Sequence, residues 1–153
     1  MKTFLKFTVL SAVLLMLAGG LASCNNREDP VEIPFTEFSL VETSCHWVNL
    51  AHDNRVIIIN SDEHLKNHIN CLVESFPGID FSEYTLLLVS GTAHQNIVSM
   101  NFCLTRHSAG RYRLNVEIHL GAGDAMEPWA IALLAGKINN SSRINMNIQT
   151  IYN

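Results

Sequence analysis

The feature that most constrains the fold of this chain is a pair of strictly alternating segments joined by a short connection. Apolar residues occupy every second position over residues 98–104 and again over residues 112–120, and mostly polar residues stand between them. A period of two sends successive side chains to opposite faces of a strand. Gly110, in the connection, suits a tight reversal of the chain. The sequence therefore predicts an antiparallel hairpin with one buried and one wetter face.

Other segments have the length and composition of strands. Residues 55–60 are rich in β-branched side chains, and residues 129–135 form another apolar run. Residues 84–90 are apolar with little alternation, which is typical of a central strand buried on both faces. Residues 143–149 alternate as the hairpin does. We therefore expect five or more strands.

A single segment predicts a long helix. Ser61 is a good N-cap, and Asp62 and Glu63 place acidic groups in the first turn. Apolar residues then recur with helical spacing, and Pro77 with Gly78 ends the segment. The members of this apolar stripe are Leu65, Ile69, Leu72, Val73 and Phe76. The expected fold class is α+β with two layers, in which one main helix packs on a mostly antiparallel sheet of five or more strands.

The N-terminal segment has the three parts of a secretory signal peptide. Two lysines precede an apolar stretch from Phe7 to Ala18, and small residues lead up to Cys24. The apolar stretch is shorter than the roughly 20 residues that a membrane-spanning helix needs. Residues 1–23 are therefore expected to be removed from the mature protein.

The residues around the expected cleavage point, Leu21-Ala22-Ser23-Cys24, resemble a bacterial lipobox. The resemblance implies that Cys24 is acylated and becomes the first residue of the mature protein. Several acyl chains on one residue anchor a protein stably, so the membrane is an expected partner through the lipid on Cys24. Asn25, where an aspartate would favour retention at the inner membrane, favours the outer membrane of a bacterial cell envelope. The periplasmic and the surface-facing leaflet both stay open, and an ordinary signal peptide with an incidental cysteine is the alternative.

The remaining chain has the size of one domain. Removing residues 1–23 from the 153 leaves 130, which is enough for a single core. Residues 24–34 are interpreted as lipidated cysteine and tether, and residues 35–153 as one α+β domain. Because two lysines leave with the signal, basic residues fall from 10 to 8 against 14 acidic ones, and the formal charge moves from −4 to −6. An acidic domain without a basic run argues against nucleic acid and against adsorption to anionic lipid.

Several segments together resemble a known group of proteins. They are Cys45-His46-Trp47, residues 56–61, residues 79–88 and residues 129–137. In this order they resemble small Bacteroidetes-type lipoproteins of unknown function. The succession of strand, helix, Ile79-Asp80-Phe81-Ser82 and apolar strand is also similar to the C-terminal domain of the B-type family of accessory subunits in protease complexes. That resemblance implies a non-catalytic, regulatory role beside an envelope protease, and it carries over no functional residue.

Three cysteines remain in the expected domain, and an oxidising envelope permits one disulfide between two of them. At about 100° per residue, Cys71 on the predicted helix points away from the apolar stripe and needs a partner. Cys45 is close enough in sequence to fold back over that side of the helix. Of the three possible pairings we therefore predict a Cys45–Cys71 disulfide, with Cys103 as a free thiol on the wetter face of the hairpin, and the other two pairings stay open.

A metal site is the alternative use of the same segment. His64, His68 and Cys71 recur at helical spacing on one flank, and His46 adjoins Cys45, so nitrogen and sulfur ligands suited to zinc would meet. The segment lacks the glutamate that a His-Glu-x-x-His protease uses as its base. The plainer interpretation is solvated histidines beside a disulfide, and no cofactor is expected.

The wetter face of the hairpin, extended by the last strand, is the expected binding surface. Its amides and guanidinium groups offer paired donors and acceptors to hydroxyl-rich ligands or to an extended peptide, although a plain solvated face has the same pattern. The candidate binding residues are Asn101, Arg113, Asn115, Asn145 and Asn147.

No catalytic motif stands out in the sequence, so an enzyme is not expected. The leading hypothesis is a lipid-anchored, non-catalytic binding or accessory module for another envelope protein, with a protease as one candidate, through the polar face or an edge strand. The alternatives are a surface lipoprotein that binds a glycan or small ligand, and a metal-binding protein or metal-dependent enzyme.

Overall fold

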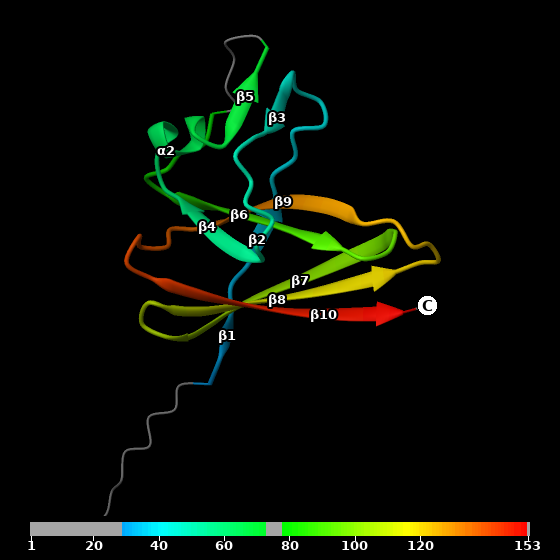
Figure 1. The fold of residues 1–153 in the computed structure, drawn as a ribbon. Coiled ribbons are helices and arrows are strands. Elements are labelled where there is room, and N and C mark those ends of the chain that lie inside the picture. Colours follow the sequence, from blue (N-terminus) through cyan, green and yellow to red (C-terminus); the bar gives the residue numbers. More distant parts are fainter. Residues whose placement is uncertain (1–28, 73–77, 153) are drawn as a thin grey trace, which may run out of the picture.

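The computed structural model describes residues 29–72 and 78–152 (Figure 1). Strands dominate these residues, and one short helix accompanies them. The elements are, in chain order, β1 (Val31–Glu32), β2 (Phe35–Glu37), β3 (Cys45–Trp47), β4 (Arg55–Ile59), α2 (Asp62–Lys66), β5 (Ile69–Cys71), β6 (Tyr84–Ala93), β7 (Ile97–Ser108), β8 (Arg111–Leu120), β9 (Glu127–Gly136) and β10 (Arg143–Tyr152).

Two four-stranded sheets face each other. The first sheet has the order β1-β7-β8-β10, and the second has the order β2-β9-β6-β4. All neighbours pair antiparallel except β8 and β10, which are parallel. The two sheets enclose a core of side chains from both, which includes Leu87, Leu104, Leu114 and Leu133. The fold is therefore a β-sandwich.

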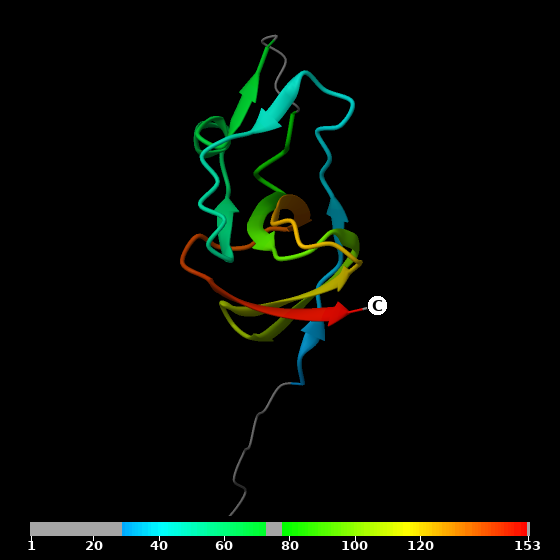
Figure 2. The same cartoon turned by 45° about the vertical axis from the view of Figure 1, so that its right-hand side comes forward.

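A third layer, which we call the cap, consists of β3, α2 and β5. Figures 1 and 2 show the cap on the side of the second sheet that faces away from β7, β8 and β10. A second apolar cluster fills the space beneath it, with Leu65 and Ile69 from the cap against Leu86 and Leu88 of β6. The second sheet is therefore covered on both faces.

The central strand β6 shows why this arrangement is stable. Thr85 and all the residues from Leu86 to Ser90 are buried. Leu87 and Val89 belong to the cluster between the sheets, and Leu86 and Leu88 belong to the cluster beneath the cap. The prediction of a strand buried on both faces is confirmed. An unbroken apolar run places side chains in the cluster on each face of the sheet.

The expected α+β class with a main helix is wrong. Ser61 does cap a helix, since its hydroxyl accepts a hydrogen bond from the His64 amide at 3.2 Å, but α2 ends at Lys66. The chain then becomes β5, which pairs antiparallel with β3. Leu72, expected on the buried stripe, is 84% exposed, while Val73 and Phe76 lie outside the described residues. The strand pairing of residues 69–71 with β3 is more favourable here than a longer helix, for which only a few apolar residues at helical spacing were evidence.

The hairpin follows its prediction, with one local exception. β7 and β8 pair antiparallel, and Gly110 adopts a φ of 71° between them. Leu114, Val116, Ile118 and Leu120 are buried, as the alternation required. Val98, however, is 60% exposed, because the pairing register shifts between Ile97 and Ser99. An extra residue in one strand turns the side chains near it out of the alternating pattern.

Gly91 marks a close approach that only a glycine permits. It lies opposite Trp129 in the β6–β9 pair and is buried. A Cβ atom at Gly91 would lie 2.4 Å from Oδ1 of Asn54 and 2.6 Å from Cζ2 of Trp129. We therefore expect Gly91→Ala to lower the free energy of unfolding by about 1–3 kcal/mol in urea denaturation, because the buried ring has little room to move.

Gly136, on β9, provides the matched control for this substitution. A Cβ atom there meets nothing within 4 Å, so Gly136→Ala should cost nothing. Equal midpoints for the two variants would show that the contact around Gly91 does not restrict the fold.

Candidate functional site

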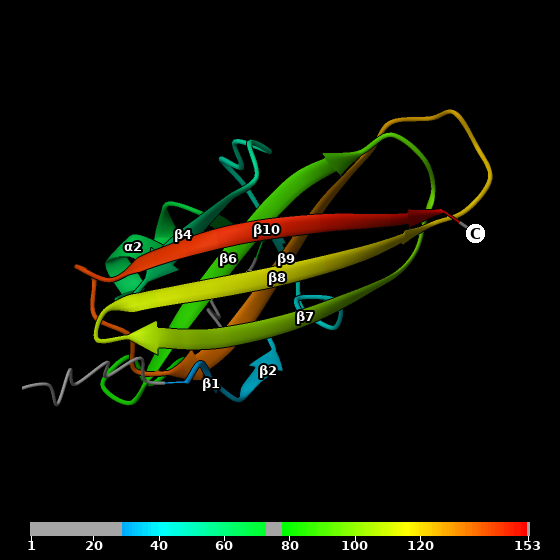
Figure 3. The ribbon, with the colours of Figure 1, turned by 90° about the horizontal axis from the view of Figure 1, so that it is seen from below.

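The candidate surface is the outer face of the first sheet, the side turned away from the second sheet (Figure 3). The strand order places β8 between β7 and β10. Cys103, Asn115 and Asn147 therefore stand in one row across the sheet, and Thr105, Arg113 and Asn145 stand in the next. The structure brings all five candidate binding residues to this face, namely Asn101, Arg113, Asn115, Asn145 and Asn147.

A hollow of about 150 Å³ lies in the middle of this face. Polar side chains of three strands line it, together with Phe102 and Val116. The polar lining residues are Asn101, Cys103, Asn115, Glu117 and Gln149. Asn101 and Asn115 are thus the candidate binding residues that reach the hollow. Glu117 and Gln149 follow the same alternating pattern, but the pattern alone does not show which of its members surround a depression.

Glu117 is the acidic residue that lines the hollow, and two neighbouring side chains contact its carboxyl group. Its Oε1 accepts a hydrogen bond from Nδ2 of Asn101 at 3.1 Å and lies 2.8 Å from Nε2 of His119. The hydrogen bond with His119, and then that with Asn101, lowers the pKa of the Glu117 carboxyl group. Glu117 is therefore held as a carboxylate, an acceptor suited to hydroxyl or ammonium groups of a ligand.

The free edge of β10 borders the same face. β10 pairs with β8 over ten consecutive residue pairs, from Arg143 with Arg111 to Tyr152 with Leu120, and no register shift interrupts them. Its other edge has no partner strand within the described part of the chain. Backbone donors and acceptors along this edge therefore stay available to an added strand.

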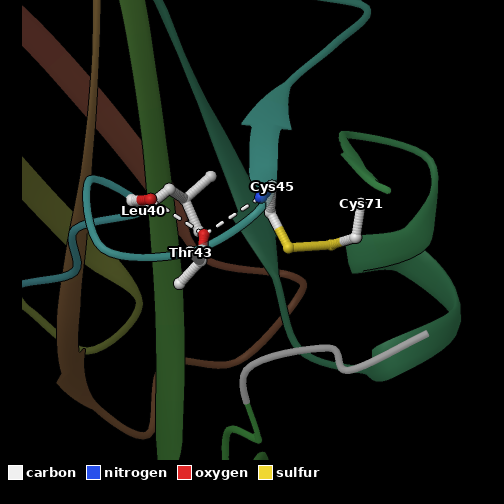
Figure 4. The surroundings of a disulfide bond; sticks show 4 residues. All are labelled: Leu40, Thr43, Cys45 and Cys71. Atoms are coloured by element: carbon white, nitrogen blue, oxygen red, sulfur yellow. Dashed lines mark hydrogen bonds between the residues drawn. A yellow bond between two sulfur atoms is a disulfide. The ribbon is translucent and has the colours of Figure 1, made fainter. Parts of the chain in front are cut away.

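The disulfide prediction is confirmed. Cys45 and Cys71 are bonded at an S–S distance of 2.01 Å, and they stand directly opposite each other in the β3–β5 pair. The hydroxyl group of Thr43 accepts a hydrogen bond from the Cys45 amide and donates one to the carbonyl of Leu40, which fixes the turn before β3 (Figure 4). Cys103 is a free thiol on the outer face.

The histidines of the cap do not meet the cysteine that the metal hypothesis required. The rings of His64 and His68 have centroids 5.5 Å apart, but the sulfur atom of Cys71 is bonded to Cys45 and is no thiolate ligand. Across the described segments, no group of three or more His, Cys, Asp or Glu side chains is placed to hold a metal ion.

His68 should nevertheless make the cap sensitive to pH. Its Nδ1 atom is buried without a partner, and burial, followed by the neighbouring His64, lowers the pKa of His68. The unfolded chain then takes up a proton before the folded chain does as the pH falls. We therefore expect the free energy of unfolding to decrease as the pH falls from about 6.5 towards the folded-state pKa.

Urea denaturation at a series of pH values measures this effect. His68→Gln should flatten the dependence below pH about 6.5, whereas His46→Gln, which changes an exposed histidine of the same cap, should leave it in place. Identical slopes for the wild type and His68→Gln would refute the assignment to His68.

Comparison with protein-family models, with curated proteins and with solved structures yields no match to this chain. Separately, none of the helical residues that the structure describes forms a segment long and apolar enough to cross a membrane.

Proposed function

We propose that the mature protein is a lipid-anchored, non-catalytic accessory module of the bacterial cell envelope, and that it binds another envelope protein through the free edge of β10. The sequence Leu21-Ala22-Ser23-Cys24 after an apolar signal segment supports the anchor. The resemblance of the succession of strand, helix, Ile79-Asp80-Phe81-Ser82 and apolar strand to an accessory subunit of protease complexes is the support for an envelope protease as the partner.

The observation that supports the binding proposal is that β10 lacks the features that usually prevent another strand from pairing with a sheet edge. Proteins usually protect an edge strand by making it short or by giving it charges, prolines or bulges. β10 has ten residues, no proline, no register shift and no charged residue after Arg143. An extended segment of a partner can therefore add to it as a further strand.

The other edges of the two sheets differ from β10 in this respect. β1 has 2 residues and β2 has 3. β4 has 5 residues, and an ion pair of 2.8 Å between Arg55 and Asp53 stands at its start. Among the strands that end the two sheets, β10 is thus the longest, and its outer edge lacks a partner strand in the described fold along its whole length.

Side chains beside the edge would supply selectivity. Asn145, Asn147 and Gln149 lie on the outer face of β10, and Tyr152 at its end is 68% exposed. Amides pair with polar side chains of an added strand, and an exposed tyrosine offers a large contact area at a small entropic cost. The proposed partner segment is therefore extended, polar on one face and apolar on the other.

Site-specific photo-crosslinking in the envelope of the native cell tests this proposal. A photoreactive residue at position 147 should give one discrete adduct, whereas the same residue at Thr105, which β1 and β8 flank on the same face, should give none. Adding charges with Asn145→Lys and Gln149→Lys, on either side of the photoreactive residue, should reduce the adduct by about tenfold, because charged groups disfavour pairing at a strand edge. An adduct of equal yield from both positions would contradict edge pairing.

The hollow around Glu117 favours a second candidate function, the binding of a small polar ligand such as a sugar. A carboxylate flanked by amide groups can hold hydroxyl groups of a ligand. In this case Gln149→Ala should abolish binding of the protein to a glycan array, because Gln149 lines the hollow. The melting temperature should not change, because the side chain of Gln149 is exposed. A blank array for the wild-type protein would remove this candidate.

A further inference from the structure

The fold gathers three arginines at one end of the outer face. Arg111 and Arg113 lie on β8, and Arg143 begins β10 directly opposite Arg111. The amide of Arg143 donates a 2.8 Å hydrogen bond to the carbonyl of Gly110, which ties the start of β10 to the hairpin turn. All three arginines are exposed. We call them the arginine face.

No acidic side chain pairs with the arginine face among the residues that the structure describes. Asp53 contacts Arg55 and Glu117 contacts His119, and neither carboxylate contacts an arginine of this face. Glu32, the acidic residue nearest in register, stands opposite Thr105 and so lies two strands away from Arg113. Like charges directly opposite each other in a sheet are unfavourable, so the pair of Arg111 and Arg143 costs stability unless an anion lies between or above them.

The chain enters the fold at this same end. β1 pairs with β7 so that Val31 stands opposite Arg106, another exposed arginine close to the hairpin turn. Figure 3 shows the start of β1, the β7–β8 turn and the start of β10 at one end of the sheet. Neighbouring strands lie about 4.8 Å apart, so the arginine face is within about 10–15 Å of Val31.

The length of chain before β1 restricts the distance to the anchor. Val31 follows Cys24 by seven residues. Seven residues reach at most about 25 Å, even when fully extended. A lipid on Cys24 therefore keeps the arginine face within reach of the phosphate groups of the same membrane.

At the end of the outer face that carries the arginines, charge favours one orientation on that membrane, although Glu32 and Glu117 also stand on this face, two strands away from Arg113 and four residues further along β8. Asp62 and Glu63 lie in α2, and Glu42 lies shortly before β3. These elements form the cap, on the opposite side of the molecule from β7, β8 and β10 (Figure 1). An anionic surface attracts the arginine face and repels the cap. The net negative charge of the chain does not show this separation of basic and acidic ends, because the fold brings the arginines together from two separate strands.

We propose that the arginine face docks on the anionic lipid headgroups of the membrane that holds Cys24, so that the cap points away from the membrane. The inference rests on the proposed lipid anchor and names the surface of the domain that meets the bilayer. Docking would fix the direction in which the free edge of β10 is presented to a partner.

Chemical protection of arginine on vesicles tests the docking. The mature chain, residues 24–153 with Cys103→Ser, contains every described strand and can be coupled through the thiol of Cys24 to a maleimide lipid. It is compared on vesicles of phosphatidylcholine alone and on vesicles that also contain phosphatidylglycerol. Phenylglyoxal modifies exposed arginines, and peptide mapping measures the rate at each position.

On the anionic vesicles the modification rate of Arg111 and Arg143 should fall by about fivefold or more relative to the neutral vesicles, and high salt should abolish this protection. Arg55, at the edge of the second sheet, is the internal control and should change little. The double variant Arg111→Gln/Arg143→Gln should lose the protection of Arg113, whereas Arg55→Gln should keep it. Equal rates on both vesicles, or equal protection of Arg55, would overturn the proposal.

Failure of docking and failure of anchoring are separable, because the chemical coupling supplies an anchor in the vesicle assay. Anchoring itself is measured on the full-length chain from bacterial cells, as the mass of acyl groups on the N-terminal tryptic peptide, residues 24–27. An acylated peptide with unprotected arginines would refute docking alone. An unmodified Cys24 would refute the anchor, and with it the reason for docking.

Discussion

Replacing Leu87 with alanine, and in a separate variant Leu88 with alanine, should lower the free energy of unfolding by about 3 kcal/mol each, within the range of 2–5 kcal/mol for buried leucines. Both side chains are at most 1% exposed, although they are neighbours in one strand. Leu87 packs between the two sheets, and Leu88 packs beneath the cap. Each truncation leaves a cavity in a different core, so the two losses should be of similar size.

Urea denaturation with a single probe of secondary structure is sufficient for this comparison. Leu72→Ala is the matched control, because Leu72 is 84% exposed and its truncation removes little buried area. A two-layer protein with a solvated outer face would lose stability with only one of the two adjacent leucines. A large effect of Leu87→Ala beside a negligible effect of Leu88→Ala would therefore show that the cap does not cover the second sheet.

Removal of the disulfide should have an effect of comparable size. Cys45 and Cys71 are separated by 26 residues, and in the chain-entropy model the closure of such a loop contributes about 3.5 kcal/mol. The loop contains β4 and α2, and Cys45 is itself part of the cluster beneath the cap. The double variant Cys45→Ser/Cys71→Ser should therefore melt at a temperature lower by on the order of 10 °C.

Hydrogen exchange should locate this loss in the cap. Amide protons of β3 and β5 should exchange faster in the double variant, whereas those of β7 and β8, which belong to the other sheet, should keep their order of protection. Cys103→Ser serves as the control, because Cys103 forms no disulfide. Melting temperatures that agree within about 2 °C among all three proteins would contradict a stabilising role for the bond.

The candidate site was accessible from the sequence only in part. The alternation of residues 99–105, 113–119 and 143–149 sorts the polar side chains onto one face of each strand, since a strand has a fixed period of two. It does not show that β10 lies beside β8, nor that their pairing is parallel. The hollow around Glu117 and the opposition of Arg111 to Arg143 depend on that register and appear only in the folded chain.

The disulfide illustrates a correct prediction with an incorrect premise. The sequence predicts the pairing of Cys45 with Cys71 on the ground that Cys71 points away from the buried side of a helix. The structure instead places Cys71 in β5, directly opposite Cys45 in β3. The pairing survives because the two cysteines are close in sequence and the intervening segment folds back on itself in either arrangement.

The sequence by itself determined those features that depend on local periodicity. This group includes the five strands from β6 to β10, the burial of β6 on both faces, and the start of α2 at its N-cap residue Ser61. The tertiary structure decided the rest: a helix of only five residues, a sandwich of two sheets, and the gathering of charge at one end. The physical reason is the range of the interactions, because caps and alternation act within a few residues, whereas strand pairing and a closed disulfide join segments distant in the chain.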